Sequence, residues 1–430
     1  MATKRITAWN AETIAIGSEL LVGGRLDTNS LFLGEQLAAV GLNLRFKTVV
    51  GDHASDIMAA LATAVRRARV VVMTGGLGPT IDDLTREAVA RLSGYRLRRR
   101  KEALEGMTAR LAQWGRRPSP GQLRQALIPA GASVISNPVG SAPGFALRWK
   151  GALIAVLPGV PREMESMMQK EVMPRIRDWL REQQAAGLIP LTRRVFHTVG
   201  LPEADVDAAL TGLVPPRMPV DLGMLASPLG VVVSLTTKSG HAVEGLDFER
   251  LSEEVRRRLR EAVYAEGNET MEEVVGRELA ARRLTVAVAE SCTGGLIAHR
   301  LTQVPGSSAY LDRGVVCYSN RAKTDLLGVP ASLIARHGAV SKEVAIAMAR
   351  GVRRRSKVSI GLSVTGIAGP GGATATKPVG LVYVGMDCGA GNVTSNEFRF
   401  HGDRHLIKQR SSQAALNLLR RWLLNREPSR

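Results

Sequence analysis

Short apolar runs alternate with amphipathic helical patterns at the start of the chain. The apolar runs Thr13–Gly17, Leu44–Val50 and Val70–Thr74 are separated by helical patterns, one of which covers Asp56–Arg67. Strands that alternate with helices are typical of a doubly wound α/β sheet, because each crossover helix covers one face of the sheet. A further apolar run, Ala152–Leu157, precedes a helix that we expect to continue to about Leu180. Residues 1–180 are therefore predicted to form one doubly wound α/β domain.

The same alternation returns in the last third of the chain. An apolar run at Leu284–Ala289 ends at Glu290, and a helical pattern starts at Leu296. Two further apolar runs, Val358–Val364 and Leu381–Met386, are predicted to be strands. Residues 272–430 are therefore predicted to form a second α/β domain.

Between these domains the pattern changes to that of a small α+β module over residues 190–268. We predict, in chain order, a strand, a helix, a hairpin and a charged helix, at Arg194–Val199, Glu203–Leu213, Asp221–Thr237 and Phe248–Val263. This order is compatible with a KH-like module. However, Gly200-Leu201-Pro202-Glu203 is not the GxxG loop that clamps an RNA backbone. We interpret the module as a structural connector that follows a polar linker at Arg181–Pro190.

Composition narrows the class of protein. The chain has 430 residues, of which 45% are hydrophobic and 23% charged, as expected for two or three soluble domains. Neither an 18-residue apolar run nor a signal-peptide core is present, so we expect a cytoplasmic protein without a membrane span. The three cysteines, Cys292, Cys317 and Cys388, are too far apart for a zinc motif or a disulfide framework.

The net charge of +19 suggests an anionic partner, which could be nucleic acid, a membrane surface or a phosphorylated metabolite. The basic runs Arg96–Lys101, Arg256–Arg260 and Arg353–Arg355 each lie on or beside a helical pattern, which favours a solvated helix face. Aromatic residues make up only 4% of the chain, too few to stack single-stranded bases well. Nucleic acid is therefore the least favoured of these partners.

The first candidate catalytic residue lies in the turn between the strand at Leu284–Ala289 and the helix that follows it. Ser291 stands in this turn, and Lys323 follows a second apolar strand, Gly314–Tyr318, by one helical turn. Residues at the carboxyl ends of neighbouring parallel strands can meet, and a desolvated lysine can act as the base that activates a serine. The alternative is that Ser-Cys-Thr-Gly-Gly only caps the helix, with glycines for close packing.

Cys292 is the rival nucleophile, since a thiol is intrinsically more reactive than a hydroxyl. A cysteine amidase needs a histidine partner, and His299 lies about two helical turns, or ~10 Å, further along. We therefore favour Ser291 and expect a small structural role for Cys292.

Three loops of the N-terminal domain fall at predicted strand ends. They are Gly17-Ser18-Glu19, Gly51-Asp52 and the segment Thr74–Asp83, which contains three glycines. Glycines let a backbone approach a phosphate closely, and adjacent aspartates suit a hard divalent cation. The alternative is a glycine turn with an aspartate N-cap. The loop is neither a Walker A motif nor GxGxxG.

Together these motifs resemble the CinA family of competence/damage-inducible proteins. The N-terminal part is similar to the MoaB/MogA molybdopterin-binding fold in the segments GSELLVGGRLDTNS, VGD, TGGLGPTIDD, SAPGF and LPGVPREM. The C-terminal part is similar to the nicotinamide mononucleotide amidohydrolase domain in the segments AESCTGG, GVVCYSNRAK, GAVSKEVAIAMA, TGIAGPGG, KPVG and GDR.

The resemblance implies two hydrolase activities in pyridine nucleotide salvage. The C-terminal domain would convert nicotinamide mononucleotide to nicotinate mononucleotide and ammonia without a cofactor. The N-terminal domain would hydrolyse ADP-ribose to AMP and ribose 5-phosphate with a divalent metal ion, Mg or Co, and K as an optional further ion. The resemblance also implies a homodimer. Two alternatives stay open: a non-hydrolytic pterin- or nucleotide-binding N-terminal domain, and a competence-related factor associated with nucleic acid.

The resemblance also assigns site residues. Ser291 would be the nucleophile, Lys323 its base and Tyr318 an assistant in the proton network, with the oxyanion held by N–H groups near Thr293–Gly295. The deamidase substrate would be bound by Glu290, Thr293, Gly294, Gly295, Thr365, Gly366 and Arg404. The N-terminal nucleotide would be bound by Gly17, Ser18, Glu19, Asn29, Thr74, Gly75, Gly76, Gly78, Pro143, Gly144, Gly159, Pro161 and Glu163. The metal ligands would be Asp52, Asp82 and Asp83, with Glu19 a weaker candidate.

Two positions depart from the family pattern. The loop before Lys377 reads Ala373-Thr374-Ala375-Thr376, where relatives tend to carry acidic residues, and Arg69 stands where an aspartate is usual. Neither change affects the proposed catalytic groups.

Overall fold

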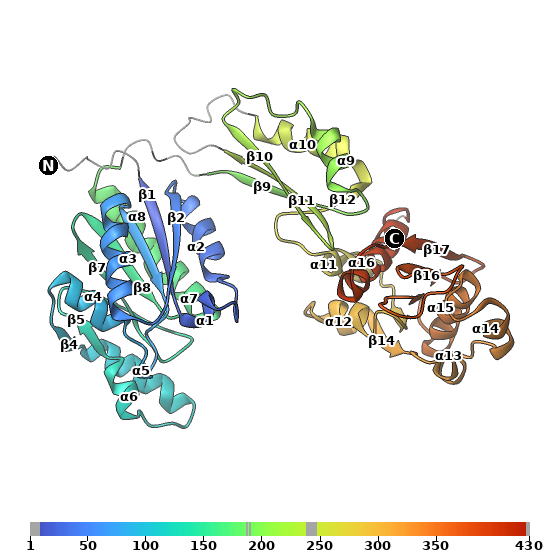
Figure 1. Cartoon of the computed structure of the whole chain (residues 1–430), viewed down its shortest axis with the longest axis horizontal. Coiled ribbons are helices and arrows are strands. Elements are labelled where there is room, and N and C mark those ends of the chain that lie inside the picture. The colour runs from blue at the N-terminus through green and yellow to red at the C-terminus, as the bar shows by residue number, and fades with distance from the viewer. Residues whose placement is uncertain (1–8, 186–187, 189–190, 238–246, 427–430) are drawn as a thin grey trace. The chain divides into compact units, whose positions relative to one another are not determined.

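The computed structural model describes residues 9–185, 188, 191–237 and 247–426. The chain divides into two compact units, with the main boundary between Thr192 and Arg193 and with Thr237 assigned to the first unit. The first unit holds the N-terminal domain, and the second holds the small α+β module and the C-terminal domain (Figure 1).

The N-terminal domain is built on a six-stranded sheet with the order β2-β1-β3-β8-β7-β6. Its strands are β1 (Asn10–Ile16), β2 (Asn43–Val50), β3 (Val70–Thr74), β6 (Ser133–Ile135), β7 (Gly144–Trp149) and β8 (Ala152–Leu157). Strands β2, β1, β3 and β8 are parallel, as predicted, whereas β7 and β6 are antiparallel to their neighbours. The connection after β1 leads to β2 on one side, and the connection after β3 leads toward β8 on the other side, so the topological switch point lies between β1 and β3.

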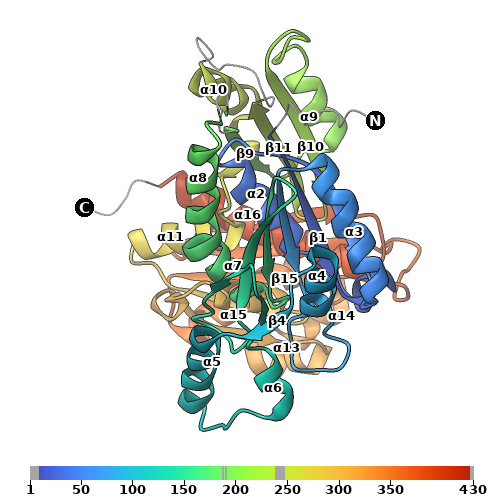
Figure 2. The same cartoon turned by 90° about the vertical axis from the view of Figure 1, so that its left-hand side faces the viewer.

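Both faces of this sheet are covered, and β3 is accordingly buried at every position and apolar from Val70 to Met73. Val71 and Met73 belong to the core beneath α3 (Ala54–Arg67), and Val70 and Val72 belong to the core beneath α8 (Met173–Glu182). Figure 2 shows α3 and α8 on opposite sides of the strands. The predicted doubly wound architecture is confirmed.

The remaining helices of this domain are α1 (Ser18–Leu21), α2 (Asn29–Ala38), α4 (Thr85–Ser93), α5 (Lys101–Gln113), α6 (Pro120–Arg124) and α7 (Pro161–Met167). Between α7 and α8 the helix passes through a π-helical turn at Met168–Val172. Pro174 follows this turn and has no backbone N–H to donate, which favours such an irregularity.

One N-terminal segment was not predicted from the sequence. Helices α5 and α6 lie beside a two-stranded ribbon formed by β4 (Leu97–Arg99) and β5 (Leu127–Pro129). These strands are too short to give a recognisable alternation of apolar and polar residues.

The small α+β module has a four-stranded sheet with the order β10-β11-β9-β12. In chain order its elements are β9 (Arg193–Thr198), α9 (Glu203–Leu210), β10 (Val220–Ser227), β11 (Gly230–Thr237), α10 (Phe248–Leu259), a 3₁₀ turn at Arg260–Ala262 and β12 (Val263–Glu266). The prediction of a helix as far as Val263 is wrong. Arg260 takes a positive φ of 48°, and Val263 then pairs with Thr198 of β9.

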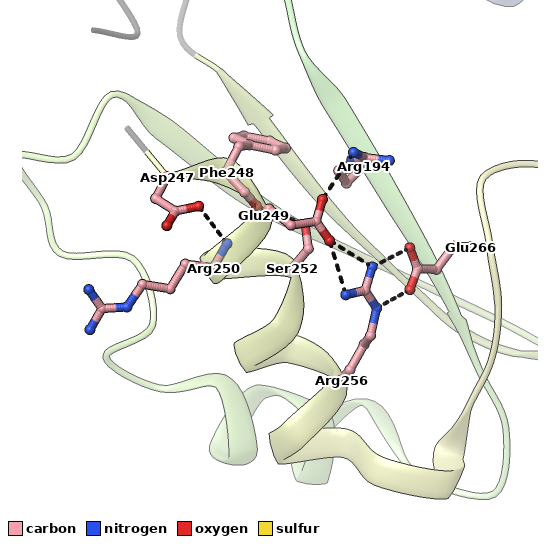
Figure 3. A network of polar contacts seen from close by, with 8 residues as sticks. All are labelled: Arg194, Asp247, Phe248, Glu249, Arg250, Ser252, Arg256 and Glu266. Carbon is pink, nitrogen blue, oxygen red and sulfur yellow. Dashed lines mark hydrogen bonds and ion pairs between the residues drawn. The ribbon is translucent and has the colours of Figure 1, made fainter. Parts of the chain in front are cut away.

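A network of ion pairs fastens α10 to this sheet (Figure 3). The Arg256 guanidinium donates to both oxygens of Glu266 in β12 and to Glu249, and Glu249 also accepts from Arg194 in β9. The next two arginines of the same basic run, Arg257 and Arg258, both pair with Glu254. Much of the charge of this run is therefore balanced within the module, which leaves less of it for a nucleic-acid phosphate.

The C-terminal domain has a five-stranded sheet with the order β14-β13-β15-β16-β17. Its strands are β13 (Val286–Glu290), β14 (Leu311–Val316), β15 (Ile360–Gly366), β16 (Leu381–Asp387) and β17 (Val393–Arg399). The first three are parallel, and β16 and β17 are antiparallel to their neighbours. The predicted bounds of the strand Gly314–Tyr318 are wrong. Strand β14 starts earlier, at Leu311, and ends at Val316, so that Cys317 and Tyr318 belong to the loop after it.

Helices cover both faces of this sheet as well. One core packs Val286 and Val288 against residues of α11, α12 and α16, and the other packs Ala287 and Ala289 against residues of α13, α14 and α15. The bounds are α11 (Met271–Ala281), α12 (Leu296–Thr302), a 3₁₀ turn at Ser307–Ala309, α13 (Asn320–Leu327), α14 (Ala331–His337), α15 (Lys342–Ser356) and α16 (Arg404–Leu424). Among the described residues, no helix combines the length and the apolar character that crossing a membrane requires.

Candidate active site

Ser291 and Lys323 meet at the carboxyl edge of the C-terminal sheet. Ser291 directly follows β13, and its N–H donates to the carbonyl of Val364 in β15 over 3.0 Å. Lys323 lies in the first turn of α13, whose N-terminus is capped by the Ser319 hydroxyl. The Lys323 Nζ is 3.1 Å from the Ser291 Oγ. Ser291 and Lys323 therefore lie close together, as the order of strands and helices predicts.

The Lys323 amine is buried among oxygen atoms beside Ser291. Only 1% of the residue is exposed, and its Nζ also donates to the carbonyls of Cys317 (3.0 Å) and Tyr318 (3.2 Å). Burial lowers the pKa of the Lys323 amine below its ordinary value, because a desolvated ammonium is unfavourable. A neutral amine next to a hydroxyl can accept the proton of that hydroxyl.

Glu290 organises the loop that carries Ser291. It is fully buried, and its carboxylate accepts the N–H groups of Gly295 (3.0 Å), Ile297 (3.1 Å) and Ala298 (2.9 Å) at the start of α12. A carboxylate at a helix N-terminus also interacts favourably with the positive end of the helix dipole. The expectation that Glu290 binds substrate is therefore corrected: it positions the loop, and it occupies the anion-binding end of α12.

The same contacts narrow the choice of oxyanion donors. The Gly295 N–H is held by Glu290, and the Gly294 N–H donates to the carbonyl of Ser291 over 3.2 Å, so neither glycine is free for this role. Within the described residues, the N–H groups of Cys292 and Thr293 have no carbonyl or carboxylate acceptor. Thr293 is fully buried and Cys292 is only 5% exposed, so of these two residues Cys292 is the more accessible to a substrate; the buried Oγ1 of Thr293 has no partner among the described residues.

The structure favours Ser291 over Cys292 as the nucleophile. Cys292 is only 5% exposed, and burial raises the pKa of its thiol to about 12. A thiol with this pKa is almost entirely protonated near neutral pH, and the thiolate is the reactive form.

Arg404 and Tyr318 stand together beside the catalytic pair. The Arg404 guanidinium donates to the Tyr318 hydroxyl over 3.0 Å and to the carbonyl of Gly369 over 2.8 Å. The Tyr318 side chain is 60% exposed, whereas its carbonyl accepts from Lys323. Two predicted residues from distant parts of the sequence are therefore brought to one side of the site.

Thr365 and Gly366 lie at the carboxyl end of β15, next to β13. The Thr365 hydroxyl is buried and donates to the carbonyl of Ala339 over 2.8 Å, so it also fixes the loop between α14 and α15. Lys377, from the KPVG segment, donates from its Nζ to the carbonyls of His337 (2.6 Å) and Val340 (2.7 Å). It ties the glycine-rich loop after β15 to the same segment.

A second candidate site lies at the switch point of the N-terminal sheet. The loop after β1 contains Gly17, Ser18 and Glu19, and the loop after β3 starts at Gly75 and Gly76, which both adopt positive φ. A Cβ on Gly75 would lie 2.1 Å from the carbonyl of Ile16, so only glycine fits between the two strand ends. The carboxyl edge of an open α/β sheet at its switch point is where such sheets bind ligands.

Other predicted nucleotide-binding residues lie around the same edge. Thr74 ends β3, and Gly144, preceded by Pro143, begins β7 beside the end of β8. Asn29 donates to the carbonyl of Gly159 over 2.9 Å, and its buried Oδ1 has no partner. Pro161 and Glu163 start α7, where Glu163 accepts from Asn137 over 2.7 Å.

The three predicted metal ligands do not form one ligand set. Asp83 accepts from the N–H of Gly78 (2.7 Å) and from the N–H and hydroxyl of Thr80 (2.8 and 2.5 Å), so it closes the glycine loop. Asp52 accepts the N–H of Ser18 over 2.8 Å. Across the described part of the chain, no three Asp, Glu, His or Cys side chains group as metal ligands. These residues therefore do not fit a metal held by side chains alone.

Sequence reasoning missed the residues that support the N-terminal glycine loop. Arg86 is 2% exposed and donates to the carbonyls of Leu77 (2.8 Å) and Gly78 (3.0 Å), and the Gln125 amide donates to that of Leu77 (3.0 Å). Both side chains hold the loop through its carbonyl oxygens. No local motif links Gln125 to a loop so far away in the sequence.

Comparison with known families agrees with this arrangement. Residues 12–178 match the family described as "Probable molybdopterin binding domain", residues 193–265 match "Damage-inducible protein CinA KH domain", and residues 268–423 match "CinA C-terminal domain".

Known proteins similar to this chain cover nearly its whole length. A "Putative competence-damage inducible protein" of Moorella thermoacetica is 44% identical over 414 residues, which is 96% of this chain and 98% of the relative. A "CinA-like protein" of Geotalea uraniireducens is 41% identical over 96% of this chain and 97% of its own length. A crystal structure of competence/damage inducible protein CihA from Agrobacterium tumefaciens is 42% identical and covers 36% of this chain and 98% of its own, with a TM-score of 0.35.

Proposed function

Because this chain belongs to the CinA family of competence-damage inducible proteins, we propose that its C-terminal domain hydrolyses the carboxamide of nicotinamide mononucleotide. The observation that carries this proposal is the distance of 3.1 Å between the Lys323 Nζ and the Ser291 Oγ in a buried setting. A serine with an adjacent neutral amine is equipped for acyl transfer from an amide.

In the first half of the reaction, the Ser291 Oγ attacks the carboxamide carbon while the Lys323 amine takes the hydroxyl proton. The negative charge that develops on the carbonyl oxygen is stabilised by backbone N–H groups of the loop after Ser291, of which we favour that of Cys292. The Lys323 ammonium then returns the proton to the departing nitrogen, so that the carbon–nitrogen bond breaks and ammonia leaves. The nicotinoyl group remains as an ester on Ser291.

In the second half, water replaces ammonia. The neutral Lys323 amine takes a proton from the water as its oxygen attacks the ester carbon, and the proton is then given to the Ser291 oxygen. Nicotinate mononucleotide leaves and both side chains return to their starting protonation states. Arg404 and Tyr318 hold the nucleotide beside the pair, with Arg404 supplying positive charge for its phosphate.

The test is product formation by the full-length protein. Nicotinamide mononucleotide should yield ammonia and nicotinate mononucleotide in equal amounts, and in ¹⁸O-labelled water the new carboxylate should gain one labelled oxygen. The Ser291→Ala variant should make neither product. Absence of ammonia with the wild-type protein, under conditions in which it is folded, would refute the deamidase assignment.

A second function is favoured by the residues at the switch point of the N-terminal sheet. Glycines at positive φ and the unpartnered Asn29 Oδ1 support binding of a phosphorylated nucleotide there, and the family resemblance points to ADP-ribose. We propose that this domain binds ADP-ribose and cleaves its pyrophosphate. The rival is a pterin- or nucleotide-binding domain without hydrolysis.

These alternatives separate in one assay. The protein is mixed with ADP-ribose in separate reactions without added ions and with Mg²⁺, Co²⁺ or K⁺. If the domain is a hydrolase, AMP and ribose 5-phosphate should be released in at least one of these reactions. Asn29→Ala should weaken binding of ADP-ribose measured by calorimetry. Binding without release of AMP under any of these conditions would leave only the carrier function.

A further inference from the structure

An unpaired lysine lies over the glycine loop of the C-terminal site. Lys408 is on α16, and its Nζ is 3.6 Å from the position that a Cβ of residue 294 would take. The side chain is half-buried. Among the residues that the structure describes, no carboxylate lies within ion-pair distance of this ammonium.

Lys408 and Arg404 form a pair of cations on one helix face. They are four residues apart in the first turns of α16, so their side chains are neighbours. Like charges at this spacing repel each other, and Arg404 also has no carboxylate partner in the described part of the chain. Its guanidinium donates to two neutral groups, the Gly369 carbonyl and the Tyr318 hydroxyl. Two uncompensated cations beside a catalytic loop are typical of an anion-binding position.

The nearest helix N-terminus cannot take that anion. Its N–H groups at Gly295, Ile297 and Ala298 already donate to the Glu290 carboxylate. Asp403 likewise accepts the N–H of Leu406 over 2.8 Å at the start of α16. The positive charges that can bind a dianionic group in this site are therefore those of the Arg404 and Lys408 side chains.

We propose that Lys408 contacts the 5′-phosphate of the substrate and makes the C-terminal site selective for nucleotides over nucleosides. This inference rests on the proposed deamidation. Arg404 is held in one orientation by Gly369 and Tyr318, and Lys408 is a point charge on a flexible stem that closes over the phosphate from the side of Gly294.

The test compares substrates with and without a phosphate. Lys408→Met should lower kcat/KM for nicotinamide mononucleotide about 10- to 100-fold, mostly through KM, because one charge-assisted contact is lost. Nicotinamide riboside should be turned over as poorly as by the wild-type protein. Lys408→Arg should recover much of the loss, and Lys170→Met, an exposed lysine of the N-terminal domain, should change nothing.

Inhibition by ribose 5-phosphate gives a second readout that needs no turnover of the riboside. Its inhibition constant should rise about as much as KM in Lys408→Met, about 10-fold or more. Equal losses for the nucleotide and the riboside, or an unchanged inhibition constant, would overturn the inference. If the wild-type protein does not deamidate nicotinamide mononucleotide, the deamidase proposal fails, and calorimetric binding of ribose 5-phosphate still decides whether Lys408 belongs to an anion site.

Discussion

Two loops of this protein share a plan and differ in chemistry. Each follows a buried parallel strand, contains glycines at positive φ, and is closed by a carboxylate that accepts backbone N–H groups. Glu290 does this in the C-terminal domain and Asp83 in the N-terminal domain. Only the C-terminal loop carries a hydroxyl that meets a buried amine. The C-terminal loop thus supplies the scaffold and the nucleophile Ser291, and the amine comes from α13 in the neighbouring crossover.

The largest effect should come from removing that amine. We expect Lys323→Met to lower kcat for deamidation about 10²- to 10⁴-fold, the range typical of a general base. Lys323→Arg should lose as much, because a guanidinium stays protonated. Ammonia release at saturating substrate measures the effect, and cooperative thermal unfolding serves as the control for folding. Activity retained in Lys323→Met would remove the distinction between the two loops.

The pH dependence should carry the signature of the same amine. Burial lowers the pKa of Lys323, and the reaction needs its neutral form. The value of kcat should therefore fall as the pH drops through this pKa, with a midpoint below the ordinary range of a lysine. A rate that rises as the pH falls would contradict the assignment of Lys323 as base.

The two loop-closing carboxylates offer a matched comparison. Glu290→Gln should destabilise the fold by about 1–3 kcal/mol, because an amide cannot accept all three buried N–H groups. It should also lower deamidation about 10- to 100-fold by displacing Ser291. Asp83→Asn should weaken ADP-ribose binding and leave deamidation unchanged. Equal effects of both variants on deamidation would mean that Glu290 has no special relation to Ser291.

The smallest effect should follow loss of the Tyr318 hydroxyl. Tyr318→Phe removes one acceptor from Arg404, so kcat/KM should fall only about 2- to 10-fold. The free energy of unfolding should hardly change, because the side chain is 60% exposed. Steady-state kinetics with nicotinamide mononucleotide measures the change, and a loss as large as that of Lys323→Met would give Tyr318 a direct role in proton transfer.

The layered fold and the meeting of Ser291 with Lys323 could be predicted because they follow from strand and helix order. Parallel strands end at one edge, and residues just beyond those ends meet there whatever the side-chain details. The antiparallel strands β7, β16 and β17 could not be predicted in the same way. Apolar runs look alike in parallel and antiparallel strands, and only the pairing partners decide the direction.

The roles of residues that can form alternative hydrogen bonds could not be predicted from the sequence either. Glu290 and Asp83 are acidic residues beside glycine loops, a pattern that equally suits a ligand contact and a loop closure. Each carboxylate closes its loop because backbone N–H groups, such as those of Ile297 and Thr80, point toward it. The directions of these N–H groups are set by the folded backbone. The support of the N-terminal loop by Gln125 joins residues 48 positions apart, which no local pattern reveals.

The most direct test of the central claim compares Ser291→Ala with Cys292→Ala in deamidation of nicotinamide mononucleotide. The two residues are adjacent, and only Ser291 contacts the Lys323 amine, whereas the buried Cys292 thiol has a pKa of about 12. Ser291→Ala should abolish ammonia release and Cys292→Ala should retain most of it. Loss of activity in Cys292→Ala with activity retained in Ser291→Ala would contradict the account.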